Sequence, residues 1–202
     1  MKEVKICGLK RMEDIEYVNE FKPDYVGFVF ANSKRQVSIQ TGAMLCKGLS
    51  PEIKKVGVFV NEAPKVINRA IKECGLDIIQ LHGDEGPDFV DYIEAQAWKA
   101  FRVKSAKDIE DIESYPVSGY LLDAYSEDAY GGTGIRFNWE IVREVKTEKK
   151  LILAGGINID NIEEAIKIPN VDVIDVSGGV ETDGVKDKNK IRELIGKVRN
   201  HG

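Results

Sequence analysis

Short apolar runs alternate along the whole chain with segments whose apolar residues are spaced three and four apart. The first pattern is typical of buried strands and the second of helices with one buried face. The order repeats as strand then helix, and eight strands are predicted. They are Glu3–Ile6, Tyr25–Phe30, Lys55–Val60, Ile78–Leu81, Ala97–Arg102, Gly119–Asp123, Leu151–Ala154 and Val173–Val176.

The predicted helices carry start and stop signals as well as periodicity. In residues 61–75, Asn61 can cap the helix, Pro64 suits its first turn and Gly75 can end it in a left-handed conformation. Its apolar stripe is Val66, Ile67, Ala70, Ile71 and Cys74. The stripe of the last helix is Ile191, Leu194, Ile195 and Val198. Residues 104–115 are too weakly periodic to favour a full helix over a short or irregular one.

The chain of 202 residues holds eight units of a strand and a helix, with no linker between them. We expect an α/β protein, a (β/α)8 TIM barrel near the lower size limit of that fold, with residues 1–202 forming a single domain. A doubly wound open sheet is the alternative. Eight units would be many for one such sheet, and the Gly-x-Gly-x-x-Gly turn of dinucleotide-binding folds is missing after the first strand.

Composition narrows the classes of function. The net charge of −5 and the absence of a basic stripe argue against nucleic acid as the main ligand. We expect no membrane span and no signal peptide, because no apolar run has the required length. Three widely spaced cysteines suit the reducing cytoplasm, and with only two histidines a metal site is not expected.

Polar and small residues concentrate where the predicted strands end, which in a TIM barrel is the face that carries function. Two Gly-Gly turns, at 154–157 (AGGI) and 177–180 (SGGV), directly follow the seventh and eighth strands. Loops at these positions commonly hold a phosphate on backbone N–H groups, and a side chain there would block the anion. Ser177 could add a hydroxyl donor, although each turn alone is compatible with a simple chain reversal.

Alternate residues of a strand point to the same side, so strand parity predicts which side chains face the barrel interior. Lys5 and Cys7 share one face of the first strand, and Asp123 is the last inward residue of the sixth. A thiol and a carboxyl across a pocket can act as base and acid. Asp175 of the eighth strand could pair with Lys5, unless Lys5 reaches solvent at the start of its strand.

The sequence resembles the phosphoribosylanthranilate isomerase family of tryptophan biosynthesis. The resemblance covers nearly the whole chain in order. It is carried by VKICGL (4–9), DYVGFVFANSKRQVS (24–38), VGVFVNE (56–62), QLHGDE (80–85), LLDAY (121–125), YGGTGIRFNW (130–139), LAGGIN (153–158) and DVSGGVE (175–181).

The resemblance implies an Amadori rearrangement of N-(5-phosphoribosyl)anthranilate, with no metal or organic cofactor. Cys7 matches the family's general base and Asp123 its general acid. Arg35 matches the arginine that pairs with the anthranilate carboxylate. The substrate-binding residues that we expect are Arg35, Gln80, His82, Gly155, Gly156, Asp175, Ser177, Gly178 and Gly179, below a loop formed by Gly131, Gly132, Thr133 and Gly134.

Two other functions remain open at this point. A histidine-pathway isomerase acts on a related aminoaldose, but it uses aspartates in both roles and carries two phosphate sites. A non-catalytic barrel that binds a phosphorylated metabolite would keep the glycine turns without needing Cys7 opposite Asp123. The expected partner is therefore a small phosphorylated substrate, with neither nucleic acid nor membrane, and the chain acts as a monomer or a homodimer.

Overall fold

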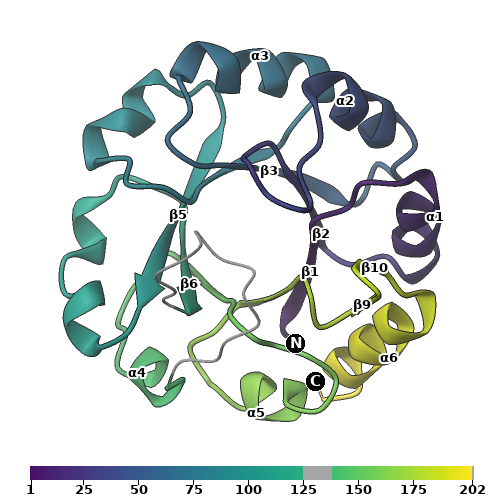
Figure 1. Ribbon diagram of the computed structural model, residues 1–202. Coiled ribbons are helices and arrows are strands. Elements are labelled where there is room, and N and C mark those ends of the chain that lie inside the picture. The colour runs from purple at the N-terminus through teal and green to yellow at the C-terminus, as the bar shows by residue number, and fades with distance from the viewer. Residues whose placement is uncertain (125–137, 202) are drawn as a thin grey trace.

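Eight parallel strands close into a barrel in the computed structural model, which describes residues 1–124 and 138–201. Each strand pairs with the next in the chain, and β8 pairs with β1 (Figure 1). The strands are β1 (Glu3–Cys7), β2 (Tyr25–Val29), β3 (Lys54–Phe59), β4 (Ile78–Leu81), β5 (Gln96–Val103), β6 (Gly119–Ala124), β7 (Lys150–Leu153) and β8 (Val173–Val176). This closure confirms the predicted barrel and excludes the open sheet.

Helices surround the barrel in the connections between strands (Figure 1). The α-helices are α1 (Met12–Phe21), α2 (Ile39–Lys47), α3 (Pro64–Cys74), α4 (Glu140–Arg143), α5 (Ile162–Ile166) and α6 (Lys188–Arg199). The 3₁₀ segments are η1 (Pro87–Tyr92), η2 (Ala106–Ile109) and η3 (Ile112–Ser114). A short hairpin of β9 (Glu181–Thr182) and β10 (Val185–Lys186) lies between β8 and α6.

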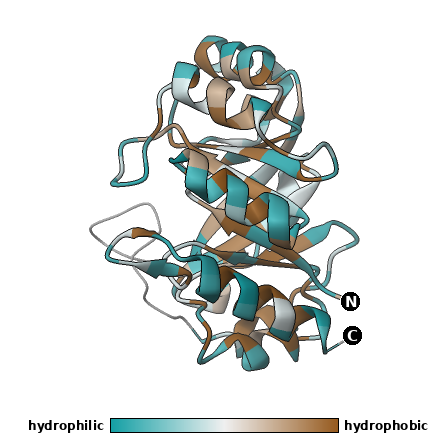
Figure 2. Ribbon diagram, turned by 90° about the vertical axis from the view of Figure 1, so that its right-hand side faces the viewer, coloured by the Kyte–Doolittle hydropathy of each residue, from teal (hydrophilic) through white to brown (hydrophobic). Residues whose placement is uncertain are grey.

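Strand parity divides the core into two layers. Outward residues such as Val4 and Ile6 pack with the helices. The helices that face the viewer in Figure 2 carry both hydrophilic and hydrophobic residues. Inward residues form a second cluster inside the barrel. Its members are Tyr25, Val56, Ile78, Trp98, Ala100, Leu121, Ile152, Ala154 and Val173. The interior is thus filled by side chains, as expected of an eight-stranded barrel.

The helix α3 confirms part of its predicted pattern and corrects the rest. Gly75 ends it in the left-handed conformation, with φ of 61°, as predicted. The predicted cap is wrong: Ala63 is the N-cap, because Pro64 is the first helical residue and Asn61 lies too far upstream. Val66 is also exposed, since it lies about 100° around the helix from buried Ile67.

One further helix prediction is confirmed, and one choice that the sequence left open is decided. The four residues of the stripe on α6 are all buried. Residues 104–115 form the two short 3₁₀ segments η2 and η3 instead of a full helix. Within the described ranges, no helix has the length and apolar character needed to span a membrane.

Leu122→Ala should test the outer core layer. Leu122 is fully buried between the barrel and the helices, so its truncation leaves a cavity and lowers the free energy of unfolding by about 2–5 kcal/mol. Urea denaturation measures the loss. The control Met44→Ala, at a residue that is 54% exposed, should change stability by less than about 0.5 kcal/mol. Equal effects of the two changes would contradict this packing.

Candidate active site

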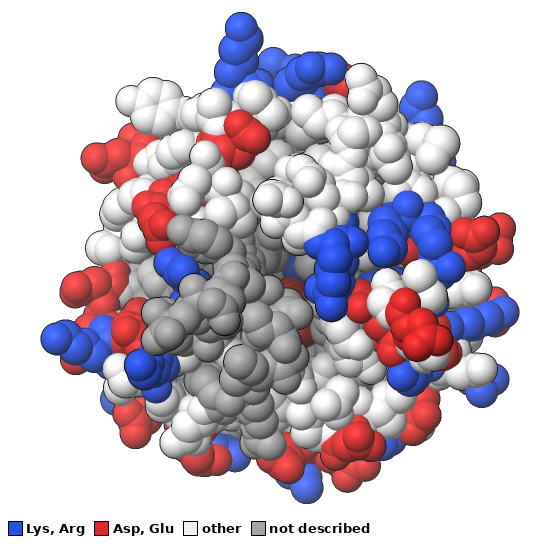
Figure 3. Space-filling model, viewed as in Figure 1, with Lys and Arg blue, Asp and Glu red and all other residues white. Residues whose placement is uncertain are grey.

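The predicted site residues come together at the ends of the barrel strands. Figures 1 and 3 look along the barrel axis, and Figure 3 shows basic side chains beside the centre of this face, on the side of β2 and β10. The charged and polar side chains Lys5, Arg35, Gln80, His82, Asp123 and Asp175 are all buried. Such groups are rarely buried unless they are paired, so their partners define the site.

Lys5 and Asp175 form an ion pair inside the barrel. They are direct register partners on β1 and β8, and Lys5 Nζ lies 2.8 Å from Asp175 Oδ2. The same ammonium donates a hydrogen bond of 2.8 Å to Gln80 Oε1 on β4. Although burial opposes its charge, Asp175 and the Cys7 thiol raise the pKa of Lys5 above its usual value. The predicted pair is therefore confirmed, and the solvent-reaching alternative is wrong because Lys5 is 0% exposed.

Cys7 lies two residues beyond Lys5, at the mouth of the barrel. Burial raises the pKa of its thiol, while the ammonium groups of Lys5 and Lys186 act in the opposite direction. Gly27 on β2 is the register partner of Cys7 and leaves room for the thiol. A Cβ at Gly27 would lie 2.6 Å from Cys7 Sγ. Gly27 was missed from the sequence, since its role depends on the alignment of two strands.

A histidine lies beside the predicted acid. His82 Nδ1 is 2.7 Å from Gln80 Nε2, and His82 Nε2 is 3.3 Å from Asp123 Oδ2. The other oxygen of Asp123 accepts a hydrogen bond of 2.8 Å from the backbone N–H of Ala124. The predicted set of Gln80, His82 and Asp123 is thus brought together by β4 and β6.

Arg35 is held by a carboxylate that was not among the predicted site residues. Its Nε and Nη2 donate to the two oxygens of Glu181, at 2.7 and 2.8 Å. Lys186 Nζ donates to Glu181 Oε1 at 2.8 Å and to the Ser177 carbonyl at 3.0 Å. Glu181 stands in the DVSGGVE segment, but Lys186 lies in a polar loop with no motif to single it out.

The path of Arg35 over the end of β1 requires a glycine. Gly8 has φ of 85°, and a Cβ there would lie 2.4 Å from Arg35 Cδ. Both features exclude a larger residue at this position. The glycine after Cys7 therefore makes room for the arginine that crosses it.

The two Gly-Gly turns lie side by side. A Cβ at Gly179 would be 2.0 Å from the Ile157 carbonyl oxygen, and Gly155 and Gly156 have φ of 85° and 68°. Ser177 Oγ donates to the Cys7 carbonyl at 3.0 Å, so its hydroxyl proton ties the β8 loop to β1. Gly178 lies next to Arg35, since a Cβ there would be 3.2 Å from Nη2.

Some predicted features lie elsewhere or outside the described residues. Gly131, Gly132, Thr133 and Gly134 fall in the segment 125–137, which the structure does not describe. Cys74 is buried in the helix layer, as the apolar stripe of residues 61–75 predicts, and Cys46 is buried in the same layer, away from these strand ends. Within residues 1–124 and 138–201, no cluster of three or more His, Cys, Asp and Glu residues could hold a metal ion.

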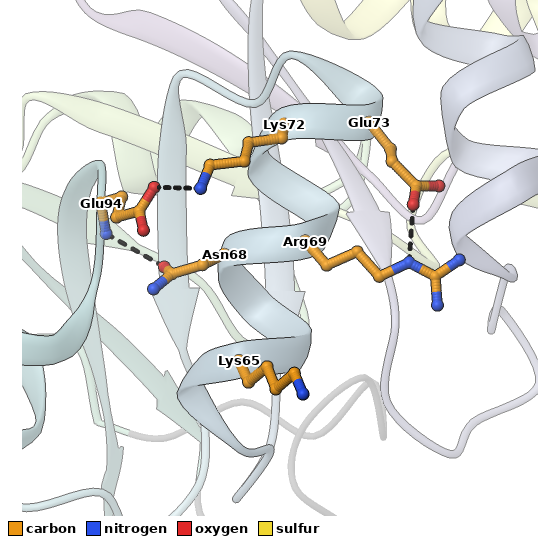
Figure 4. Close-up of a pocket in the computed structure, with 6 residues that line it drawn as sticks. All are labelled: Lys65, Asn68, Arg69, Lys72, Glu73 and Glu94. Carbon is orange, nitrogen blue, oxygen red and sulfur yellow. Dashed lines mark hydrogen bonds and ion pairs between the residues drawn. The ribbon is translucent and has the colours of Figure 1, made fainter.

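A surface pocket on α3 is separate from this site. Figure 4 shows its lining, in which Lys72 pairs with Glu94 at 2.8 Å and Arg69 with Glu73 at 2.6 Å. Both ion pairs are exposed to solvent, and Lys65 leaves the lining with one net positive charge. The buried charged and polar side chains lie at the barrel mouth and not in this pocket.

Comparison with known proteins assigns the family. Residues 4–197 match the family model of N-(5'-phosphoribosyl)anthranilate (PRA) isomerase. The chain belongs to the phosphoribosylanthranilate isomerase family. It is 48% identical over 200 residues to the N-(5'-phosphoribosyl)anthranilate isomerase of Thermoanaerobacter sp. (strain X514), with 98% of each chain covered.

Solved structures of phosphoribosylanthranilate isomerases have the same fold. One is the Thermotoga maritima enzyme, described as monomers generated from a dimeric isomerase, with a TM-score of 0.86 and 34% identity. Another is an isomerase in complex with reduced 1-(o-carboxyphenylamino)-1-deoxyribulose 5-phosphate, with a TM-score of 0.85 and 31% identity. Both likenesses cover 99% of this chain and 100% of the other.

Gly27→Ala should impair the isomerase through Cys7. The new methyl group would displace the thiol, and a misplacement on the order of 1 Å lowers kcat by about 10²-fold. Steady-state kinetics of phosphoribosylanthranilate isomerisation measure this. Gly196→Ala, where a Cβ meets no atom within 4 Å, is the matched control and should leave kcat unchanged. Full activity of the Gly27 variant would show that the thiol does not need this space.

Glu181 should contribute to the acid sensitivity of the isomerase. Burial opposes its ionisation, but Arg35 and Lys186 outweigh burial and lower the pKa of Glu181 to about 2. Because this pKa is depressed, the stabilisation is present above about pH 5 and is lost as the pH falls towards 2.

Urea titrations from about pH 5 to about pH 3 test this effect. The stability advantage of the wild type over Glu181→Gln should shrink as the pH falls. The control Glu16→Gln removes an exposed carboxylate and shows how much of the change is common to any surface glutamate. A constant advantage over Glu181→Gln would contradict the depressed pKa.

Proposed function

We propose that residues 1–202 form a single catalytic domain that isomerises N-(5'-phosphoribosyl)anthranilate to 1-(2-carboxyphenylamino)-1-deoxyribulose 5-phosphate. Membership of the family supports this substrate. The observation that carries the catalytic assignment is the placement of Cys7 and Asp123. Both are buried at the mouth of the barrel, the thiol beside the ammonium of Lys5 and the carboxyl beside His82.

The two side chains divide the proton transfers of an Amadori rearrangement. Asp123 donates a proton to the ring oxygen of the ribose as the ring opens and the C1′–N bond becomes a Schiff base. The positive charge of this protonated Schiff base makes the C2′ proton acidic. The Cys7 thiolate removes that proton to give an enolamine. The enolamine then takes up a proton at C1′ and loses the 2′-hydroxyl proton, which yields the ketose. Acid and base assistance of this kind contributes about 10² to 10⁴ in rate.

Arg35 is proposed to hold the carboxylate of the anthranilate. Its Nε and Nη2 edge is occupied by Glu181, which leaves the Nη1 and Nη2 edge for a second carboxylate. Arg35, Glu181 and Lys186 together carry one net positive charge, which matches one substrate carboxylate. Without Lys186 the charge of Glu181 would cancel that of Arg35.

The remaining polar groups are proposed to bind the phosphate and the amine. Gly155, Gly156, Gly178 and Gly179 offer backbone at two adjacent turns without side chains that would keep an anion away. Asp175 Oδ2 is occupied by Lys5, whereas Oδ1 is buried and has no hydrogen-bond partner among the described residues. This oxygen can accept a hydrogen bond from the substrate nitrogen.

The proposed reaction also limits the cofactors and partners that the chain needs. Each step is a proton transfer, so the chain needs neither a metal nor an organic cofactor. Its partner is a small phosphorylated molecule and not nucleic acid, and it acts in the cytoplasm as a monomer or a homodimer. The acidic net charge supports the exclusion of nucleic acid, and three cysteines without a disulfide support the cytoplasm.

Removal of either proposed catalytic group should abolish turnover. Cys7→Ala and Asp123→Asn should each lower kcat by about 10² to 10⁴ or more, because each removes one proton transfer. The fluorescence of phosphoribosylanthranilate follows the reaction. Cys46→Ala and Asp160→Asn remove a thiol and an exposed carboxylate elsewhere, and these controls should stay active.

The same assay separates the alternatives. Full activity of either catalytic variant would remove the role assigned to that residue. A wild type that turns over only the aminoaldose of the histidine pathway would indicate the related isomerase instead. Binding of phosphoribosylanthranilate without turnover would indicate a non-catalytic barrel.

A further inference from the structure

A chain of three polar side chains crosses the barrel interior next to the proposed acid. Lys5 on β1 contacts Gln80 on β4, and Gln80 contacts His82 just beyond the end of that strand. All three are buried, with exposed fractions of 0%, 1% and 7%. Bulk water cannot readily replace these partners, so each hydrogen bond constrains the next.

The donors and acceptors of these three side chains allow only one direction of hydrogen bonding, from Lys5 through Gln80 to His82. A lysine ammonium can only donate, so the Gln80 atom that lies 2.8 Å from Nζ must be the carbonyl oxygen. The amide nitrogen of Gln80 then faces His82 Nδ1 at 2.7 Å. Because an amide NH₂ group can only donate, Nδ1 must accept and carries no proton.

The proton of His82 is therefore on Nε2. A doubly protonated ring would place Nδ1–H against the amide NH₂, so two donors would face each other in a buried site. The hydrogen bond from Gln80 therefore also favours the neutral ring. Nε2 lies 3.3 Å from Asp123 Oδ2, but it makes no hydrogen bond with any of the described residues. A buried donor beside the acid is thus left for another acceptor.

We propose that Lys5 and Gln80 are positioning residues that fix His82 as the neutral Nε2–H tautomer, which donates to an oxygen of the bound sugar beside Asp123. This rests on the proposed function, in which Asp123 must hold a proton to give to the ring oxygen. A positively charged imidazolium next to Asp123 would favour the ionised carboxylate and oppose that step. A neutral ring binds the sugar without that effect.

The tautomer can be measured directly because the chain has only two histidines. Long-range ¹H–¹⁵N correlation spectra of the ¹⁵N-histidine-labelled protein near neutral pH distinguish the two ring nitrogens, and His201→Gln assigns the second signal set. We expect a pyridine-type Nδ1 and a pyrrole-type Nε2 for His82. A protonated Nδ1 in the wild type would overturn the proposal.

Gln80→Glu reverses the hydrogen bond to His82 with almost no change in the size of the side chain. A carboxylate accepts from both Lys5 and Nδ1, so the His82 proton should move to Nδ1 or both nitrogens should become protonated. We expect kcat to fall at least tenfold, with KM within about threefold of the wild type, because the change acts on His82 and the acid and leaves the carboxylate and phosphate contacts intact. Gln36→Glu, at an exposed glutamine, is the matched control and should change neither spectrum nor kcat.

Gln80→Met is the second variant, in case a glutamate at this position prevents folding. It removes the donor to Nδ1, so His82 should show averaged signals of two exchanging tautomers. An unchanged His82 spectrum in the folded Gln80 variants would overturn the proposal. A wild type with the expected tautomer but no turnover of phosphoribosylanthranilate would overturn the proposed function alone.

Discussion

The buried ion pair between Lys5 and Asp175 is the constraint on which the rest of the site depends. It joins β1 to β8 at the seam where the barrel closes, and Lys5 has no contact with solvent. Taking an ammonium out of water is costly unless every proton finds an acceptor. Asp175 and Gln80 provide two acceptors, and the Cys7 thiol lies beside the same ammonium. The ammonium of Lys5 therefore lies beside the proposed base and also contacts Gln80 on β4. His82, just beyond the end of β4, lies beside the proposed acid.

A second set of charges lies on the same side of the mouth, next to the ends of β1 and β8. Arg35 is locked by Glu181, and Lys186 ties Glu181 to the loop after β8. Glycines give this side its space, because Arg35 passes over Gly8 and against Gly178. Lys5 thus lies with the proposed acid and base, whereas Arg35 and the glycine turns form the proposed sites for the carboxylate and the phosphate.

Strand parity explains how much of the site could be predicted from the sequence. The two-residue period of a strand places Lys5 and Cys7 on one face and Asp123 at the end of another, and the structure agrees. Gly27 could not be found in this way, because its role depends on the register between β1 and β2. Lys186 could not be found either, since it lies on a hairpin whose direction no periodicity determines. The wrong cap at Asn61 has a local cause: a good capping residue was present, but Pro64 determined where the helix began.

The Lys5–Asp175 pair is expected to organise the site and not to stabilise the barrel. The double variant Lys5→Met/Asp175→Leu removes both charges at once, and such replacements of buried ion pairs are often neutral or stabilising. Thermal unfolding and kcat/KM for phosphoribosylanthranilate should be measured on the same sample. The account predicts a melting temperature at or above that of the wild type with kcat/KM lowered at least 100-fold. A stable variant with full activity, or a strongly destabilised one, would contradict it.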